Sequence, residues 1–191
     1  MLIDEEIEGI ATVTTDNFEG GYIAGAHLVK SGRRNLAVVS GRVNIEGGYN
    51  AGQRLAGFTM ALAAGGFRFN ESRIIEVTDY SYSDGAKSMK RLLDEKSGID
   101  GVFSAAGDEC AVGILKTARE RGVLVPKDVA VVGYDDIEIA RSASPPLTTI
   151  RQPLQEMAAA AYRMVTSTAS ETLAHPKKTL FRPELVIRES A

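Results

Sequence analysis

The residues best suited to chemistry follow four short apolar runs of the sequence. In open α/β sheets, ligands bind in the crevice beyond the carboxyl ends of the strands, so the residues after each run are candidates for a binding site. They are Gly41-Arg42, Thr78-Asp79-Tyr80, Gly107-Asp108 and Tyr134-Asp135-Asp136. The sequence therefore predicts a polar, partly aromatic rim around a small-molecule site.

Two side chains near this rim have both a ligand-binding and a structural interpretation. Arg54 is expected at the start of a helix, where its positive charge opposes the helix dipole. It either pairs with a nearby carboxylate or donates a fork of hydrogen bonds into the crevice, and we favour the crevice. Tyr80 could stack on a flat or sugar-like ligand, or it could simply cover the end of the sheet.

Two carboxylates on the rim also have alternative roles. Asp108 precedes a helical pattern, and aspartate is among the best N-cap residues, so capping is its favoured role. Asp135 follows a strand with no obvious helix to cap. It could accept a hydrogen bond from a hydroxyl or amine of a ligand, or it could stabilise a turn.

Known catalytic constellations do not occur in the sequence. The two histidines, His27 and His175, fall outside the crevice segments. Gly41–Gly48 lacks the closing Gly-Lys-Ser/Thr of a phosphate-binding loop, and Cys110, without a matching base, is expected to be a packing residue. We therefore predict a binding protein rather than an enzyme, with no catalytic residue, metal site or cofactor.

Strands and helices alternate along the part of the chain that carries these candidates. Short runs that are apolar on both faces predict strands of a parallel sheet covered by helices. They are Leu36–Ser40, Arg73–Val77, Gly101–Ala105 and Val129–Gly133. Helical patterns run from Asp16, the expected N-cap with Glu19 completing a capping box, to Lys30, from Arg54 to Ala64, from near Ser83, and from Asp108 to Gly122. One helix per strand predicts right-handed crossovers and a doubly wound α/β fold.

The two ends of the chain show other patterns. Ile10–Thr14 predicts a strand, and Pro153–Thr168 predicts a long helix. Leu180–Arg188 predicts a late strand, whose Pro183 suits an edge or a crossover position. Ala140–Thr149 is expected to be a loop, because its two consecutive prolines cannot continue a helix or a central strand.

Composition excludes several classes of protein. The 191 residues contain 22 Lys+Arg and 25 Asp+Glu, a net charge of −3, whereas a domain that binds duplex DNA alone normally carries a basic face. The single cysteine excludes a disulfide framework. No stretch approaches the roughly 20 apolar residues of a membrane span, and the acidic start is unlike a signal peptide. We expect a cytoplasmic protein that does not contact a membrane.

Several segments together resemble the LacI/GalR family of bacterial transcription regulators. The longest is Val129–Pro153, VAVVGYDDIEIARSASPPLTTIRQP. The others are Asp16–Tyr22, Gly32–Ala37, Arg54–Phe58 and Pro183–Ser190. The resemblance covers nearly the whole chain, and the order and spacing of the segments make it specific.

The resemblance implies a periplasmic-binding-protein-like fold of type I, in which two Rossmann-like subdomains are joined by three crossovers. The crossovers should fall near Phe18, Ile150 and Arg182. The chain would then hold one complete C-terminal effector-binding subdomain and a remnant of the N-terminal one, comprising residues 19–150 with 183–191 and residues 1–18 with 151–182. The family's DNA-binding helix-turn-helix is expected to be absent from this chain.

The resemblance also implies roles for the candidate residues. In the family, the positions that match Arg54 and Asp135 contact the effector, the position of Tyr80 often supplies a stacking ring, and the position of Asp108 lies at the cleft. Many sugar-responsive members have Asn where this chain has Gly107, and the Gly-Asp pair with Tyr80 resembles purine-sensing members. A sugar or sugar derivative is the expected effector, with a purine or nucleoside as the alternative.

The implied function is that of the effector-binding and dimerisation region of a DNA-binding transcriptional regulator. The helix after Asp108 and the loop around Arg141–Ser144 resemble the family's dimer contact surface, so a homodimer is expected. The effector would change subdomain closure and thereby the spacing of two attached DNA-binding heads. The alternative is a solute-binding protein of a sugar transporter, which the acidic start of the sequence disfavours.

Overall fold

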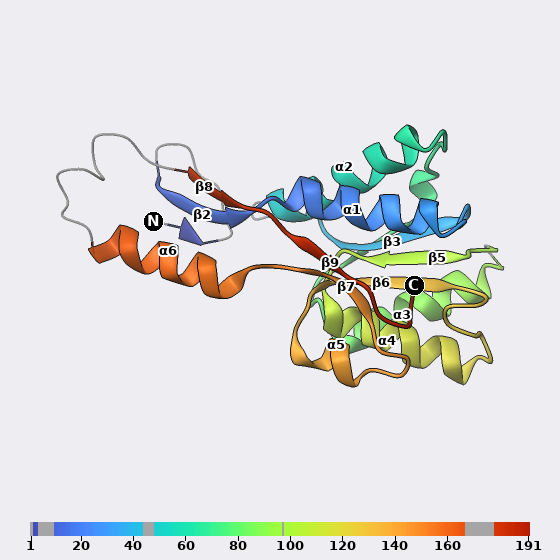
Figure 1. The fold of residues 1–191 in the computed structure, drawn as a ribbon. Coiled ribbons are helices and arrows are strands. Elements are labelled where there is room, and N and C mark those ends of the chain that lie inside the picture. Colours follow the sequence, from blue (N-terminus) through green and yellow to red (C-terminus); the bar gives the residue numbers. More distant parts are fainter. Residues whose placement is uncertain (1, 4–9, 44–47, 97, 167–177) are drawn as a thin grey trace.

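The strands of this protein form two sheets that lie side by side (Figure 1). The computed structural model describes residues 2–3, 10–43, 48–96, 98–166 and 178–191. The small sheet has the order β1 (Leu2–Ile3), β2 (Thr12–Thr15), β8 (Lys178–Phe181). The large sheet has the order β4 (Ile74–Val77), β3 (Leu36–Gly41), β5 (Gly101–Ser104), β6 (Ala130–Asp135), β7 (Thr148–Arg151), β9 (Glu184–Val186). All the pairings are parallel except that between β7 and β9.

Helices cover both faces of the large sheet, as expected for a doubly wound α/β fold (Figure 1). α1 (Asn17–Lys30) and α2 (Tyr49–Ala64) lie on one face, whereas α3 (Tyr82–Asp94) and α4 (Asp108–Glu120) lie on the other. Successive residues of a strand point to opposite faces, and in β3 the two sets contribute to two separate apolar cores. This double burial explains why the strands are continuous apolar runs, and it confirms the predicted fold class.

Glycines set the distance between α1 and α2. A side-chain carbon at Gly21 would overlap the backbone carbonyl of Arg54, and one at Gly57 would overlap the carbonyl of Phe18. The two helices therefore touch backbone to backbone at these positions. Larger residues would hold the helix axes farther apart, within the usual range of roughly 8–10 Å. This contact fixes the first turns of both helices at the same end of the large sheet.

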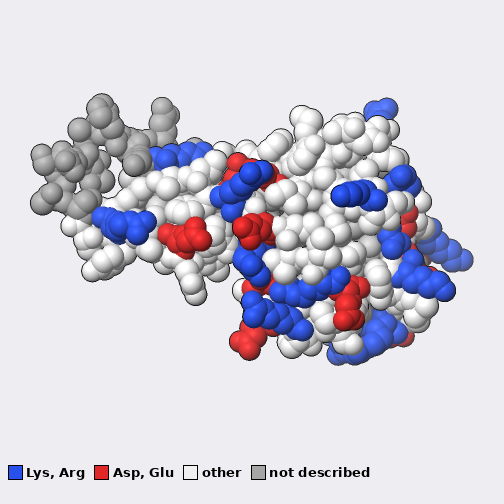
Figure 2. All heavy atoms as spheres, in the orientation of Figure 1, with Lys and Arg blue, Asp and Glu red and all other residues white. Residues whose placement is uncertain are grey.

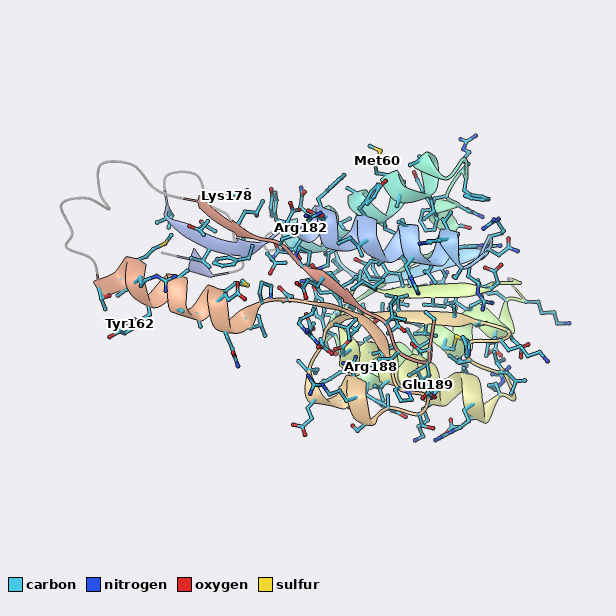
Figure 3. The ribbon with its side chains drawn as sticks, viewed as in Figure 1. Met60, Tyr162, Lys178, Arg182, Arg188 and Glu189 are labelled. Atoms are coloured by element: carbon cyan, nitrogen blue, oxygen red, sulfur yellow. The ribbon has the colours of Figure 1, made fainter. Side chains whose placement is uncertain are left out.

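Three segments connect the two sheets: β2 to α1, β7 to α6 (Leu154–Thr166), and β8 to β9. α6 packs on the small sheet through Met157, Ala160 and Ala161, which contact Val13. Its outer face carries Tyr162, which points away from the small sheet and is 71% exposed (Figure 3). None of the helices in the described part of the chain is long and apolar enough to cross a membrane.

Several predicted boundaries need correction. The predicted loop Ala140–Thr149 contains the end of a short helix, α5 (Glu138–Ser142), and the start of β7, because Thr148 and the β-branched residues after it extend the sheet. The predicted strand Leu180–Arg188 is two strands, β8 and β9, separated at Arg182-Pro183 and belonging to different sheets. Pro183 therefore lies in a crossover between the two sheets, which is one of the two positions predicted for it.

The starts of two helices also differ from prediction. Asp16 caps α1 as expected, with its carboxylate accepting a hydrogen bond from the Glu19 amide at 2.9 Å. Glu19 does not complete a capping box, because its own carboxylate accepts hydrogen bonds from Arg182. α2 begins at Tyr49, so Arg54 lies in its second turn rather than at its start. Residues 167–168 of the predicted last helix lie outside the described residues.

Substituting Gly57 by alanine should destabilise the protein by about 1–3 kcal/mol, because the added methyl group would force α1 and α2 apart. Urea denaturation measures this change. Gly52→Ala in the same helix is the matched control, since the nearest atom to its added carbon, on Val43, is 4.0 Å away. We expect it to raise stability by about 0.5–1 kcal/mol through helix propensity. Equal effects of the two substitutions would contradict a tight contact at Gly57.

Candidate functional site

The carboxyl ends of β3, β5 and β6 face the small sheet, and the predicted rim residues gather there (Figure 1). Arg54 is held on this end by three neighbours. Its Nε donates to Asn17 Oδ1 at 2.7 Å, its Nη1 donates to the carbonyl of Ala105 at 2.9 Å, and its guanidinium lies 3.7 Å from the centre of the Tyr134 ring. Tyr134 also donates its hydroxyl hydrogen to Asn17 Oδ1 at 3.1 Å. Arg54 is thus a buried cation at the sheet end with neutral partners.

This arrangement bears on the two interpretations of Arg54, which are pairing with a carboxylate and donation of hydrogen bonds into the crevice. The residue is 9% exposed and forms no ion pair within the described residues, so pairing with a carboxylate is not its role. A buried cation is stable only where hydrogen bonds and ring contacts replace water. The guanidinium has five N–H groups, and the two contacts above use two of them, which leaves three without a hydrogen bond to the described residues.

Asp135 ends β6 in an unusual backbone conformation. Its φ is 112° and that of Asp136 is 59°, two consecutive positive values at residues other than glycine. Its Oδ1 accepts a hydrogen bond from Gln152 Nε2 at 2.7 Å. Its Oδ2 lies over Gly107, where a side-chain carbon would come within 2.9 Å of it. The glycine therefore allows the Asp135 carboxylate to sit at the start of α4.

The Gln152 amide connects Asp135 to the small sheet. Its Oε1 accepts a hydrogen bond from Thr15 Oγ1 at 2.7 Å, while its Nε2 donates to Asp135. Thr15 belongs to β2, Gln152 follows β7, and Asp135 ends β6. A single side chain thus links the candidate site to two of the three segments that join the sheets.

Asp108 does not cap α4, contrary to the favoured prediction. The N-cap is Gly107, and Asp108 is the first residue of the helix. Its Oδ1 accepts a hydrogen bond from Thr149 Oγ1 at 2.6 Å and its Oδ2 one from the Ile137 amide at 3.0 Å. The side chain is turned away from the helix amides because β7 and the α5 entry offer these two donors. Asp108 therefore joins α4 to β7 and α5 beneath the site.

The environment of Asp108 disfavours its charged form. Burial raises its pKa to about 7, and the negative charge of Asp135 adds to this effect, while the hydrogen bond from Thr149 opposes it. The protonated form of the carboxyl group is thus favoured relative to that of an exposed aspartate.

Tyr80 lies on the other side of this end of the sheet, beside the carboxyl ends of β3 and β4. Its φ is 56°, and its side chain is 42% exposed. The ring reaches across the end of β3, where a side-chain carbon at Gly41 would overlap the Tyr80 hydroxyl. The side chain is therefore partly open to solvent. Tyr80 therefore flanks the cluster of Arg54, Asp108 and Asp135 rather than joining it.

The side chain of Asp136, which the sequence placed on the rim without a specific role, is a buried carboxylate that stabilises the neighbouring junction. Asp136 is 2% exposed and accepts hydrogen bonds from Arg151 Nε at 2.7 Å and Arg188 Nη2 at 2.5 Å. Burial opposes its ionisation, but these two hydrogen bonds outweigh burial and lower its pKa. Only the Asp135-Asp136 doublet marked it in the sequence. Asn17, Thr149 and Gln152 were missed as well, because their roles depend on contacts between distant segments.

Charged side chains gather where the two sheets meet (Figure 2). Arg182, on the segment between β8 and β9, donates to Glu19 at the start of α1 (Figure 3). A groove of about 600 Å³ opens nearby, between α5 and α6, and its lining includes Arg141 and Arg151. Asp135 is the only one of the four predicted site residues in that lining.

His27 and Cys110, two further titratable residues considered in the sequence, both lie in helices. His27 lies in α1, away from the sheet end, and burial lowers its pKa; His175 lies outside the described residues. Cys110 is buried, and burial raises the pKa of its thiol to about 11, which suits the predicted packing role. The described residues contain no group of three or more His, Cys, Asp or Glu side chains placed to hold a metal ion.

The fold and this site define a class of small-molecule-binding domains. The family described as the periplasmic binding protein-like domain matches residues 26–191, and the chain belongs to this family. It is similar to the HTH-type transcriptional regulator CelR of Thermobifida fusca, with 34% identity over 183 residues, 96% of this chain and 52% of CelR. It is also similar to the HTH-type transcriptional repressor PurR of Erwinia tasmaniensis, with 33% identity over 94% of this chain and 51% of PurR.

Solved structures agree with these relationships. A complex of the transcriptional regulator CelR with cellobiose has a TM-score of 0.87 and 33% identity, over 96% of this chain and 55% of that one. A LacI family regulator from Enterococcus faecium with bound ribose has a TM-score of 0.85 and 27% identity, over 99% of this chain and 69% of that one. The predicted LacI/GalR resemblance is confirmed, and it favours a regulator over a transporter component. The chain spans about half the length of the curated relatives it matches.

The raised pKa of Asp108 predicts a pH-dependent stability. The folded protein binds a proton that the unfolded chain releases near pH 4, so this stabilisation is present at low pH and is lost as pH rises towards about 7. The free energy of unfolding, measured with urea between pH 5 and pH 8, should fall with pH by about 2–3 kcal/mol relative to that of Asp108→Asn. The lowered pKa of Asp136 affects stability only below this pH range. His27 is present in both the wild type and Asp108→Asn, so its effect on stability cancels in the comparison.

The exposed carboxylate Asp94 provides the control for this measurement. It lies on α3 and pairs with Arg121 at the surface. Asp94→Asn should keep the pH dependence of the wild type. Parallel pH curves for the wild type and Asp108→Asn would show that Asp108 is not the titrating group.

Proposed function

We propose that this chain is the effector-binding region of a LacI-type transcriptional regulator and that it binds a sugar or sugar derivative at the carboxyl ends of β3, β5 and β6. The observation that carries the proposal is the gathering of Arg54, Asp108 and Asp135 at one end of the large sheet, with Tyr80 on its flank. Open α/β sheets bind their ligands at this end. The site thus combines the Asp135 carboxylate as a charged acceptor, the Arg54 guanidinium as a donor of several hydrogen bonds and the partly exposed Tyr80 ring.

Each of these groups suits a polyhydroxylated ligand. The Asp135 carboxylate accepts hydrogen bonds from hydroxyl groups, the free N–H groups of Arg54 donate to hydroxyl or ring oxygens, and the exposed face of Tyr80 stacks on the apolar face of a sugar ring. Cellobiose and ribose are bound by two structural relatives, which supports this class of ligand. A purine or nucleoside is the second candidate, because Asp135 can also accept from an amine and Tyr80 can stack on a base.

The effector would act through the junction between the two sheets. In the proposal, residues 19–150 with 183–191 form the C-terminal subdomain, and residues 1–18 with 151–182 belong to the N-terminal one. A ligand hydroxyl that donates to Asp135 competes with Gln152, which also holds Thr15. The effector therefore changes the relative free energies of the open and closed arrangements, which is the requirement for a ligand-driven switch.

The regulatory output would depend on parts of a longer protein. We propose that two copies associate through α4 and the region of Arg141–Ser144 into a cytoplasmic homodimer, and that DNA is bound only by a helix-turn-helix outside this chain. Subdomain closure would then set the spacing of the two DNA-binding heads. The net charge of −3 agrees with a sensor that does not contact DNA itself.

Isothermal titration of the purified chain with cellobiose and with ribose tests the proposed site. We expect at least one sugar to bind, and Asp135→Asn to weaken its binding about 10- to 100-fold, because a hydrogen bond to a charged group contributes roughly 1.5–3 kcal/mol. Asp94→Asn removes the same charge on a distant helix and should leave the affinity unchanged.

Two results would contradict this proposal. Wild-type affinity in Asp135→Asn would place the sugar elsewhere on the molecule. Binding of guanine or hypoxanthine, with no binding of either sugar, would replace the sugar by the purine alternative.

A further inference from the structure

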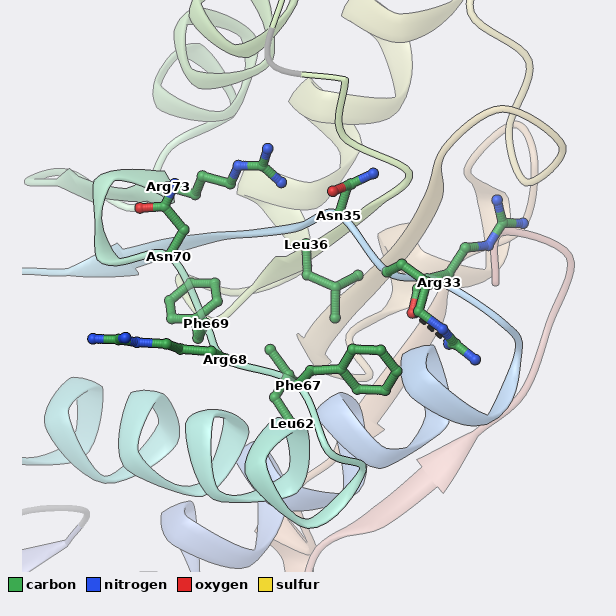
Figure 4. A pocket seen from close by; sticks show the side chains of 10 residues that line it. Arg33, Asn35, Leu36, Leu62, Phe67, Arg68, Phe69, Asn70 and Arg73 are labelled. Atoms are coloured by element: carbon green, nitrogen blue, oxygen red, sulfur yellow. Dashed lines mark hydrogen bonds between the residues drawn. The ribbon is translucent and has the colours of Figure 1, made fainter.

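A second concave surface lies at the opposite end of the large sheet from the candidate site. It is a pocket of about 140 Å³ between the start of β3, the end of α2 and the segment that follows α2 (Figure 4). β3 runs from Leu36, in this pocket, to Gly41, beneath Tyr80. The two places are therefore a strand length apart, roughly 16 Å. Nothing in the proposed sensing mechanism uses this pocket.

The pocket combines an apolar floor with a basic rim. The floor consists of Leu36, Leu62, Phe67 and Phe69. The rim consists of Arg33, Arg34, Arg68 and Arg73, together with Asn35 and Asn70. No Asp or Glu lines this pocket, although the whole chain carries a net charge of −3. Four like charges around one hollow create a positive potential that favours an acidic partner.

The guanidinium groups of three of these arginines have no carboxylate partner among the described residues, although the Asp100 carboxylate accepts hydrogen bonds from the backbone amides of Arg34 and Asn35. Arg33 donates to the backbone carbonyls of Lys127 and Pro126, and its buried Nε has no acceptor. Arg34 donates to backbone carbonyls and lies 4.5 Å from the centre of the Phe67 ring. Arg68 is exposed and has neither a hydrogen bond nor an ion pair with the described residues. Their charges are thus available to a partner.

The directions of the side chains distinguish a single ion from an extended partner. In Figure 4 the guanidinium groups fan outwards: Arg68 points away from the hollow, and Arg73 lies on the side of Asn35. An isolated phosphate or sulfate needs donors that converge on one point, which these groups do not provide. A segment that crosses the apolar floor would instead meet one arginine after another.

The shape of the surface also fits an extended partner. A second, open hollow of about 480 Å³ is lined by Arg68, Phe69, Asn70 and Glu71, so the groove continues along this segment. The pocket itself is open to the surface, and its volume of about 140 Å³ is close to the ~150 Å³ of a cavity that accepts benzene. β4 is an edge strand of the large sheet, paired only with β3 in the described part, and it follows η1 (Glu71–Arg73) beside the pocket.

We propose that this groove docks an acidic peptide segment of another protein, which inserts one aromatic side chain between Leu62, Phe67 and Phe69 and places its carboxylates against the surrounding arginines. The aromatic residue supplies the buried anchor of the interface, and the charges supply orientation and rate of association. A nucleic acid is disfavoured, because the rest of the chain is acidic and repels a continuous polyanion. This inference does not depend on the effector or its site.

Fluorescence anisotropy with a labelled ten-residue peptide tests the proposal. The peptide carries Asp and Glu on both sides of a single central Phe, and the partner is the whole chain in 50 mM salt. We expect saturable binding that weakens with added salt, and a loss of binding when the Phe is replaced by Ala or the acidic residues by Lys. Amide resonances of Phe67 and Phe69 should shift in the NMR spectrum on titration, whereas those around Asp135 should not.

Two charge reversals distinguish docking in the groove from general attraction. Arg68→Glu acts on an exposed side chain that has no partner among the described residues, so folding is preserved, and it should weaken peptide binding by roughly fivefold or more. Lys90→Glu makes the same change of charge on the exposed surface of α3, across the sheet, and should have little effect.

Three results would overturn the proposal. They are the absence of peptide binding up to about 1 mM protein, equal weakening by the two charge reversals, and tighter binding of a labelled single-stranded oligonucleotide than of the peptide. Because the readout involves no sugar, failure here leaves the proposed effector site untouched, and failure to bind a sugar leaves this groove untouched.

Discussion

The end of the large sheet is organised around one buried guanidinium group. Arg54 lies against the ring of Tyr134 and donates to Asn17 and to the carbonyl of Ala105, so it connects α1, α2, β5 and β6 at one point. A cation without a counter-charge can be buried only where its surroundings are rigid and supply acceptors. The glycine contact between α1 and α2 provides that rigidity, because Gly21 lets the backbone of Arg54 approach α1 directly. The geometry of the rim follows from this constraint.

Acidic groups occupy the other half of the same sheet end and have different chemical roles. One oxygen of the Asp135 carboxylate accepts a hydrogen bond from Gln152, and the other lies over Gly107. Asp108 is buried beneath it and accepts a hydrogen bond from Thr149. The Asp136 carboxylate is buried and pairs with Arg151 and Arg188. Their environments separate their pKa values, since burial raises that of Asp108 whereas Arg188 and Arg151 lower that of Asp136. Asp108 is thus shifted towards its neutral form, whereas Asp136 is kept charged. Both lie near Asp135, the candidate ligand-binding carboxylate.

Polar contacts of the described residues lie where the two sheets meet. Gln152 bridges Asp135 and Thr15, and Arg182 pairs with Glu19. Polar links of this kind can be exchanged for ligand contacts at small cost in free energy, whereas an apolar interface would have to be exposed to water. A site built beside such links can couple occupancy to the arrangement of the sheets. The apolar cores on the two faces of the large sheet remain intact in such a change.

The sequence by itself determined the doubly wound fold, the positions of β3, β4, β5 and β6 in the large sheet and the four residues to consider, because apolar periodicity and strand ends are local signals. It could not determine what those residues touch. Asp108 looked like a helix cap because its local context favours one, but Thr149, 41 residues away, offered a stronger partner. Gln152 and Asn17 gave no local signal, and the basic groove joins segments around Arg33 and Arg68 that are adjacent only after folding. Side-chain partners and pKa values depend on distances across the chain, and only the tertiary structure sets those distances.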